Sequence, residues 1–308
     1  MKHIGVDDIR KVLIIGAGTM GQQVGFLCAA KGFDTTIYDL SQPILDNAYA
    51  SIEKLSALFV SRGLLSNDNA QDAIARITLT TDERRAGEDA DFLSESVTES
   101  LDVKCRVLEK FGAVCPPHTV FTTNTSTLIP SLMAHATGRP PLFAAFHFHN
   151  TVSTNIVDIM PHPGTAAETV DLIRKFAIRL GQTPILIKKE NHGYAFNAIL
   201  MNLCDTALYL AAAGVSTIED IDRAWMGIMR MDMGPFGIMD SVGLDTVLKI
   251  NEIWAQQLND PKAMANMEFL KKYTDAGKLG KKTGEGFYTY PNPAFKSKDF
   301  ISTASVKN

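Results

Sequence analysis

Residues 11–21 have the sequence KVLIIGAGTMG, an apolar run that ends in the pattern Gly-x-Gly-x-x-Gly. A helix-compatible segment, residues 22–31, follows, and a second short apolar run ends at Asp39. Strand, glycine turn, helix, strand and terminal acid in this order are typical of a βαβ unit that binds a dinucleotide. Gly16 would permit the tight turn, Gly18 the approach of a pyrophosphate, and Gly21 the close packing of helix on strand.

The same unit predicts which dinucleotide binds. The pyrophosphate would lie on the N–H groups at the start of the helix, around Thr19 and Met20, where the helix dipole is positive. Asp39 would bind the two hydroxyls of the adenosine ribose, and no arginine follows it to take a 2′-phosphate. The prediction is therefore NAD rather than NADP. A glycine turn in another kind of α/β protein is the alternative.

The bulk composition is that of an ordinary globular protein. The chain has 308 residues, of which 45% are hydrophobic and 21% charged, and its net charge is −4. This charge favours neither a nucleic acid nor an anionic membrane as partner. The four cysteines are dispersed, and no apolar run approaches a membrane span or a signal-peptide core. We expect a soluble, cytoplasmic protein.

Strand-like and helix-like segments alternate through the first 190 residues. This alternation predicts an α/β fold: a doubly wound, mostly parallel, Rossmann-type sheet domain over residues 1–190. A helical hairpin at about 43–76 interrupts the alternation and is expected to be an insertion. The predicted strands after this insertion are residues 77–80, 91–95, 119–122, 142–148 and 184–187.

The pattern changes to helices after about residue 191. Residues 191–308 are predicted to form an all-helical substrate and dimerisation domain. The apolar helix over 195–213 is expected to be a central core helix or a contact between subunits. Further helices are predicted at 218–226, 241–258 and 264–275, and a final strand at 287–290.

Two polar clusters follow predicted strands, where ligands bind in such folds. Residues 123–127, TNTST, can orient a substrate oxygen or can be a turn that caps the next helix. In residues 146–150, FHFHN, strand alternation places His147 and His149 on one face. A histidine there suits removal of a hydroxyl proton, and Asp158 is the nearest carboxylate to hold its ring. A metal site on the two histidines lacks a well-spaced third ligand, so none is predicted.

A third cluster, residues 278–288, is glycine-rich and basic. It is a candidate loop for contact with a nucleotide or a solvated turn before the last strand. Its glycine spacing does not match a phosphate-binding P-loop.

Taken together, these segments resemble the L-3-hydroxyacyl-CoA dehydrogenase family over nearly the whole chain, and more specifically a divergent, 3-hydroxybutyryl-CoA dehydrogenase-like branch. Besides the glycine pattern, the shared motifs are ESLDVK at 99–104, NTS at 124–126, HFHN at 147–150, GYAFN at 193–197, MGPF at 233–236 and GKKTGEGFY at 280–288. The resemblance implies an NAD-dependent oxidoreductase of fatty acid metabolism that forms homodimers through its helical domain.

The resemblance also implies roles for single residues. His147 is similar to the catalytic base, Ser126 to the residue that binds the substrate 3-oxygen, and Asn197 to their partner. Residues that match positions around NAD are Glu99, Lys104, Asn150 and Lys282. Lys104, Ser126 and Arg62 also match positions near the acyl-CoA substrate.

This chain departs from the family pattern at a few places. Thr151 stands where the family has proline, and Leu55 where it has a serine that assists CoA binding. The stretch to Asp158 is one residue shorter, and Asp158 replaces a glutamate. The Thr151 segment resembles a branch that includes diketone-reducing enzymes.

Three functions are therefore compared. The leading one is NAD-dependent oxidation of a short-chain L-3-hydroxyacyl-CoA, such as 3-hydroxybutyryl-CoA, to the 3-ketoacyl-CoA, and the reverse. The second keeps this chemistry on a CoA-free 3-hydroxy acid, carnitine-like compound or diketo ester. The third is a non-catalytic NAD-binding protein, against which His147, Ser126 and Asn197 argue.

Overall fold

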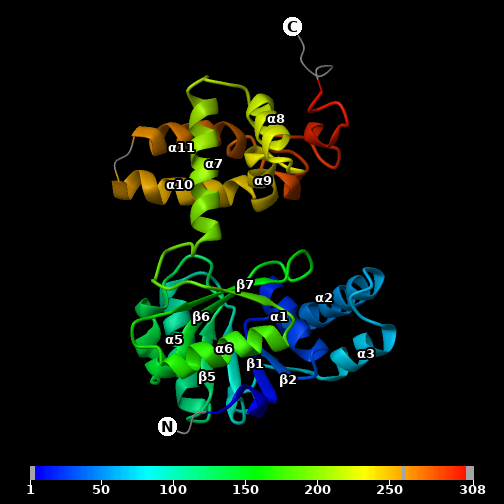
Figure 1. Cartoon of the computed structure of the whole chain (residues 1–308), viewed down its shortest axis with the longest axis vertical. Helices are drawn as coiled ribbons and strands as arrows, with labels where there is room; N and C mark the ends of the chain where they lie inside the picture. The colour runs from blue at the N-terminus through cyan, green and yellow to red at the C-terminus, as the bar shows by residue number, and fades with distance from the viewer. Residues whose placement is uncertain (1–3, 259–260, 303–308) are drawn as a thin grey trace. The chain divides into compact units, whose positions relative to one another are not determined.

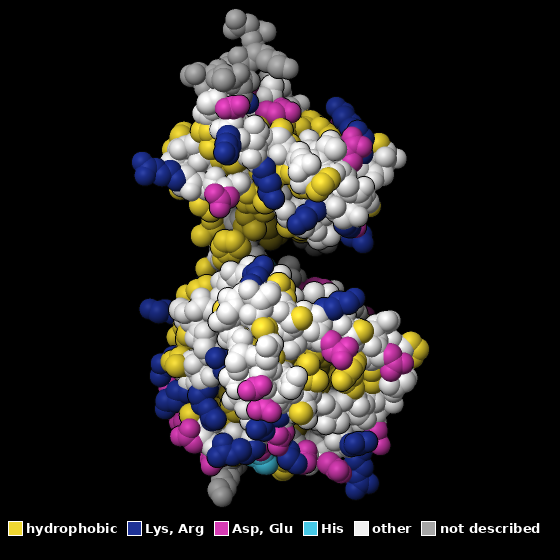
Figure 2. Space-filling model, turned by 90° about the vertical axis from the view of Figure 1, so that its right-hand side faces the viewer, with side chains coloured by type: hydrophobic (Ala, Val, Ile, Leu, Met, Phe, Trp, Pro, Cys, Tyr) yellow, Lys and Arg dark blue, Asp and Glu magenta, His cyan; other side chains and the backbone are white. Residues whose placement is uncertain are grey.

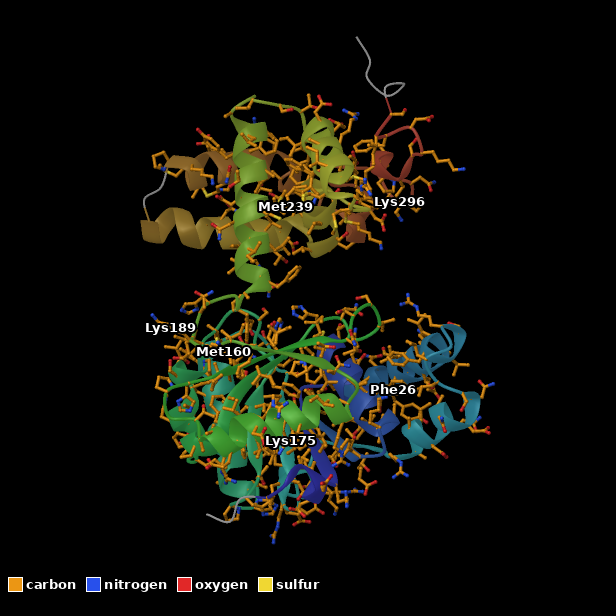
Figure 3. All side chains as sticks on the ribbon, viewed as in Figure 1. Phe26, Met160, Lys175, Lys189, Met239 and Lys296 are labelled. Carbon is orange, nitrogen blue, oxygen red and sulfur yellow. The ribbon has the colours of Figure 1, made fainter. Side chains whose placement is uncertain are left out.

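The computed structural model describes residues 4–258 and 261–302. The chain divides into two compact units, Met1–Ala195 and Phe196–Asn308, five residues after the predicted boundary. Phe26 and Met239, labelled in Figure 3, mark the cores of the first and second unit. In the described part of the chain, no helix is both long and apolar enough to cross a membrane.

The first unit is built on one eight-stranded sheet (Figure 1). Its strands lie in the order β3-β2-β1-β4-β5-β6-β7-β8. β2 and β3 are added on one side of β1, and β4 to β8 are added on its other side, so the strand order reverses between β1 and β4. β6 and β7 pair antiparallel, and every other neighbouring pair is parallel. The Rossmann-type prediction is confirmed. The strands are β1 Lys11–Ile15, β2 Asp34–Tyr38, β3 Ile77–Thr80, β4 Phe92–Glu95, β5 Val120–Thr123, β6 Phe143–Phe148, β7 Ile156–Pro161 and β8 Thr183–Leu186.

Helices cover both faces of this sheet, because the side chains of its strands alternate between two apolar layers. Ile14 and Phe146 face a core shared with α1 and α6, whereas Leu13 faces a core shared with α5. α2 and α3 form the inserted hairpin, and Ser66 caps α3 by accepting the Asn69 N–H at 3.2 Å. The helices are α1 Thr19–Ala30, α2 Gln42–Ser61, α3 Asn67–Ala75, α4 Glu83–Gly87, α5 Leu101–Val114 and α6 Ala167–Arg179.

The second unit is a bundle of helices around Leu208 and Phe236. The helix predicted over 241–258 is in fact two, because Gly243, with φ +103°, ends one and precedes the next. The helices are α7 Phe196–Ala212, α8 Ile218–Met229, α9 Pro235–Val242, α10 Leu244–Leu258 and α11 Pro261–Thr274.

The strand predicted over residues 287–290 is wrong. This segment forms turns with isolated bridges, and a carboxylate takes its backbone hydrogen bonds in place of a neighbouring strand. Asp240 accepts from the N–H groups of Phe287 and Tyr288, both at 2.9 Å. The aromatic residues of this segment therefore pack against the core of the second unit and do not form a strand.

A second buried carboxylate, Asp222, supports the same region. It accepts the N–H groups of Phe236 and Gly237 and, at 3.0 Å, the hydroxyl of Tyr288. Burial raises the pKa of Asp222 to about 6, and nearby Asp240 adds to this, although the hydrogen bonds oppose it. The folded state therefore favours the protonated acid more than the unfolded chain does.

This shift predicts a pH dependence of stability. A pKa raised on folding contributes stability at low pH that is lost as pH rises from roughly 4 to 6. We expect the difference in unfolding free energy between the wild type and Asp222→Asn to fall by on the order of 2 kcal/mol across this window. Urea unfolding at several pH values measures it. Asp275→Asn, which alters an exposed carboxylate, is the control, and a difference for Asp222→Asn that stays constant with pH would contradict the prediction.

Candidate functional site

The candidate site lies at the carboxyl edge of the sheet. β1, β2, β4, β5 and β6 run parallel, so the loops after them open on the same edge. The strand order reverses between β1 and β4, and open α/β sheets bind ligands at the edge beside such a reversal. The predicted polar clusters of the first unit follow β5 and β6 and therefore belong to this edge.

The glycine turn after β1 has the geometry that a dinucleotide needs. A Cβ on Gly16, whose φ is +99°, would lie 2.6 Å from the carbonyl oxygen of Ser96, and a Cβ on Gly21 only 1.8 Å from that of Gly16. Packing within the protein thus requires both glycines. Gly18 differs, because a Cβ there would meet no described protein atom within 4 Å. Its exposed position leaves room for a bound group at the start of α1.

Asp39 is held beside this turn at the end of β2. One carboxylate oxygen accepts the N–H of Ala17 at 2.8 Å, and the other accepts that of Leu40 at 2.7 Å. A carboxylate fixed there and only half-buried suits two vicinal hydroxyls, as an adenosine ribose offers. Gly18, Thr19, Met20 and Asp39 therefore fit NAD.

His147 and Asp158 form a cross-strand pair. They lie opposite each other in the antiparallel register of β6 and β7, and His147 Nδ1 is 3.1 Å from Asp158 Oδ2. The same oxygen is 3.0 Å from Nε2 of His149. The side chains of His147 and Asp158 are only 7% and 3% exposed, so water screens this pair little.

The charge on Asp158 fixes the orientation of the His147 ring. Burial alone would raise the pKa of Asp158, but the bonds from His147 and His149 outweigh burial and hold it below its usual value. An ionised Asp158 accepts hydrogen bonds only, so His147 donates through Nδ1. Nε2 is then the ring atom that can take a proton.

Glu99 organises the loop that carries Ser126. Its Oε1 accepts the N–H groups of Ser126 and Thr127 at 3.0 and 3.1 Å and the hydroxyls of Thr125 and Thr127. Burial opposes ionisation of Glu99, but Lys104 and these hydroxyls lower its pKa overall. The loop after β5 is thus ordered by an acid from the loop after β4.

Lys104 lies below this loop rather than at an open surface. Its side chain is 1% exposed, and its ammonium contacts Glu95 Oε1 at 2.8 Å and Glu99 Oε2 at 3.3 Å. Its single positive charge is thus shared between two carboxylates that follow or end β4. A direct contact of Lys104 with cofactor or substrate stays a prediction.

Tyr194 joins His147 to the Ser126 loop. Its ring stacks on the imidazole of His147, with centroids 4.8 Å apart and planes inclined by 21°. Its hydroxyl donates to the carbonyl oxygen of Thr125 at 2.7 Å. Burial raises the pKa of Tyr194, so the phenol remains a neutral donor.

The loop after His149 lies against α1. Gln23 accepts the N–H of Thr151 at 3.0 Å, and Arg62, at the end of α2, donates to the carbonyl oxygen of Val152 at 2.9 Å. A groove of about 430 Å³ opens between these elements. Its lining includes Thr19, Lys54, Leu55, Arg62 and Asn150. The predicted Arg62 and Asn150 thus share one groove with the start of α1.

Two predicted site residues belong to the second unit. Asn197 lies in the first turn of α7, and Lys282 forms an ion pair with Asp245 at 2.6 Å. Their part in the site stays a prediction.

Two residues around His147 were not predicted to have a role. The alternation of β6 placed His149 on the face of His147, but nothing in the chain indicated that both would share one carboxylate. Tyr194 lies 47 positions from His147 in the sequence, and only the path of the chain after β8 brings the rings together.

Comparison with known proteins agrees with this geometry. Residues 11–191 match the model of the 3-hydroxyacyl-CoA dehydrogenase NAD binding domain, and residues 193–290 match that of the C-terminal domain. A probable 3-hydroxybutyryl-CoA dehydrogenase of Deinococcus radiodurans is 34% identical, over 90% of this chain and 99% of that protein.

Solved structures are also similar. A diketoreductase described as acting on dicarbonyl compounds has 37% identity and a TM-score of 0.85, over 94% of this chain and all of that one. The (S)-3-hydroxybutyryl-CoA dehydrogenase of Ralstonia eutropha has 28% identity and a TM-score of 0.83, over 92% of this chain and all of that one. This chain belongs to the 3-hydroxyacyl-CoA dehydrogenase family, an NAD-dependent oxidoreductase family.

The stacking of Tyr194 generates a prediction. Tyr194→Phe keeps the ring and should lower kcat by a few-fold at most, whereas Tyr194→Ala releases the His147 ring and should lower kcat by about 10²-fold. NADH affinity should be unchanged in both, because neither variant alters the glycine turn. Equal losses of kcat in the two variants would show that the stacking does not position the base.

Proposed function

We propose that the chain oxidises a short-chain L-3-hydroxyacyl-CoA to the 3-ketoacyl-CoA with NAD, and catalyses the reverse reaction. The observation that carries this proposal is the His147–Asp158 pair. It lies on the same sheet edge as the glycine turn and Asp39, which supports a base that acts beside a bound dinucleotide.

The chain's own residues account for the proton. NAD, which Gly18 and Asp39 would help to hold, would supply the acceptor for the hydride of the carbinol carbon. Nε2 of His147 takes the proton of the hydroxyl as the carbonyl forms, and Asp158 stabilises the resulting imidazolium through Nδ1. The half-buried Ser126, held by Glu99, would orient the substrate oxygen, with Asn197 as its partner.

The groove beside α2 supports CoA as part of the substrate. It opens next to the loop that follows His149, and its lining includes the cations Lys54 and Arg62. Cations are suited to the phosphates of CoA, which a free 3-hydroxy acid lacks.

The alternative substrate is a CoA-free dicarbonyl or 3-hydroxy compound. The similarity to a diketoreductase favours this alternative. The chain is 37% identical to that enzyme, and 34% and 28% identical to the two 3-hydroxybutyryl-CoA dehydrogenases described above. Leu55, which lines the groove, also offers no hydroxyl for CoA.

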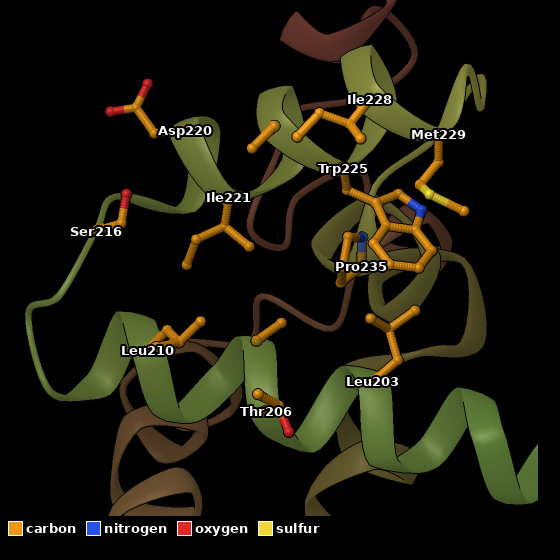
Figure 4. Close-up of a pocket in the computed structure, with 12 residues that line it drawn as sticks. Leu203, Thr206, Leu210, Ser216, Asp220, Ile221, Trp225, Ile228, Met229 and Pro235 are labelled. Carbon is orange, nitrogen blue, oxygen red and sulfur yellow. The ribbon is translucent and has the colours of Figure 1, made fainter.

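We further propose that the second unit forms a homodimer through α7 and α8. Figure 2 shows hydrophobic side chains gathered on the surface of this unit. Ile199 and Ile228 are 71% and 80% exposed. Between α7 and α8 runs an apolar groove of about 500 Å³ lined by Leu203, Leu210 and Trp225 (Figure 4). A second copy with the same apolar face would bury these surfaces.

The central prediction concerns His147. His147→Ala should lower kcat by about 10² to 10⁴-fold, the usual loss for a general base, while NADH still binds. Initial rates with acetoacetyl-CoA and calorimetry with NADH measure the two effects. Full activity of the variant would remove His147 from the mechanism.

A substrate panel distinguishes the two substrate classes. Acetoacetyl-CoA, acetoacetate and a diketo ester would each be reduced with NADH. We expect the highest kcat/KM for acetoacetyl-CoA, and Arg62→Gln should raise the KM for acetoacetyl-CoA more than the KM for the CoA-free compounds, because Arg62 is proposed to bind a phosphate of CoA. Arg76→Gln, at a surface ion pair with Asp34, is the control. Equal or better rates on the CoA-free compounds would favour the alternative.

The dimer has its own test. Ile228→Glu should convert a dimer to a monomer, because it places a charge in an apolar interface. Light scattering after size-exclusion chromatography measures the mass. Ile178→Glu, at a 53% exposed position of α6, is the matched control. A wild type with the mass of one chain would contradict the proposal.

A further inference from the structure

His147, His149 and Asp158 bring three metal-ligand atoms together. His147 Nδ1 and His149 Nε2 lie 3.1 and 3.0 Å from Asp158 Oδ2, and all three atoms lie within 4.8 Å of one another. The sequence offered two histidines on one strand face without a third ligand. The antiparallel neighbour β7 supplies it.

Two of the three separations are close to those around a small tetrahedral ion. Bonds of about 2.0–2.2 Å in a tetrahedron place ligand atoms about 3.3–3.6 Å apart. The two N···O distances, 3.1 and 3.0 Å, are slightly shorter, whereas the three ligand atoms together lie within 4.8 Å of one another. The β-ladder fixes Asp158 opposite His147, and Tyr194 supports the His147 ring from its other side. The side chain of His149 is 18% exposed, more than those of His147 and Asp158, and it would turn toward the ion to complete the site.

The ligand set selects the class of ion. Two imidazole nitrogens and one carboxylate oxygen suit Zn²⁺, with water in the fourth position. Mg²⁺ and Ca²⁺ require more ligands, all of them oxygen. We propose that His147, His149 and Asp158 form a reversible Zn²⁺ site that switches the enzyme off.

Inhibition follows from the tautomer of His147. An ion on Nδ1 replaces the proton that Asp158 now accepts, and in the neutral ring that proton moves to Nε2. Nε2 then carries a proton and cannot take one from a substrate hydroxyl. The ion also occupies the Asp158 oxygen that would stabilise the imidazolium.

Direct binding tests the site without relying on the proposed reaction. Purified protein, freed of metal with a chelator, is dialysed against micromolar Zn²⁺, and the bound metal is measured. Co²⁺ in its place reports tetrahedral coordination by its visible absorption. We expect one ion per chain in the wild type and at least ten-fold weaker binding in His149→Phe, which lacks one ligand.

Activity provides the second readout. Zn²⁺ should inhibit the wild type, and a chelator should restore its activity. With the activity of each protein expressed relative to its own rate without metal, half-inhibition of His149→Phe should need at least ten-fold more Zn²⁺ than half-inhibition of the wild type. His118→Asn alters a separate histidine that pairs with Asp91, and should respond like the wild type.

Two results would overturn the proposal. One is a wild type that binds no Zn²⁺ or Co²⁺. The other is equal inhibition of His149→Phe, which would point to another group, such as the thiol of Cys105. The inhibition readout rests on the proposed function, but metal binding that depends on His149 would stand even if no 3-oxo substrate were reduced.

Discussion

The antiparallel pairing of β6 with β7 is the constraint on which the site depends. In an otherwise parallel sheet, this one reversal places Asp158 opposite His147 in register. A shift of one residue would turn Asp158 to the other face of the sheet, where Phe146 and Val157 pack in the apolar core. The ladder hydrogen bonds therefore determine that His147 meets Asp158. Asp158 makes this contact although its side chain is shorter than the glutamate that the family has at this position.

The loops around this pair form one connected network. Glu99 binds the Ser126 loop, Asn124 accepts the N–H of Phe148 at 2.7 Å, and Tyr194 joins Thr125 to the His147 ring. Inside it, the ammonium of Lys104 forms ion pairs with both Glu95 and Glu99. Fixed polar groups of this kind do not have to reorganise when charge develops, which is how electrostatic catalysis operates.

Local sequence patterns were sufficient to predict the fold class and the features expected to bind the dinucleotide. The glycine turn and Asp39 depend on steric rules within some thirty residues, and the fold class follows from the alternation of strands and helices. Long-range partners were harder to predict. The stacking of Tyr194 on His147 and the carboxylate that His147 shares with His149 depend on which distant segments the fold brings together. Glu95 and Glu99 lie close to Lys104 in the sequence, but the local pattern does not reveal that Lys104 is buried between them. The segment at 287–290 was misassigned because buried carboxylates can replace a neighbouring strand, and alternation does not distinguish the two.

The central claim is that Asp158 holds His147 as the Nδ1–H tautomer with Nε2 ready to accept a proton. Long-range ¹H–¹⁵N correlation spectra of the imidazoles, with His147 assigned by substitution, test it most directly. The account predicts a protonated Nδ1 and an unprotonated Nε2 in the neutral ring, with this preference lost in Asp158→Asn. A neutral His147 that carries its proton on Nε2 in the wild type would contradict the account.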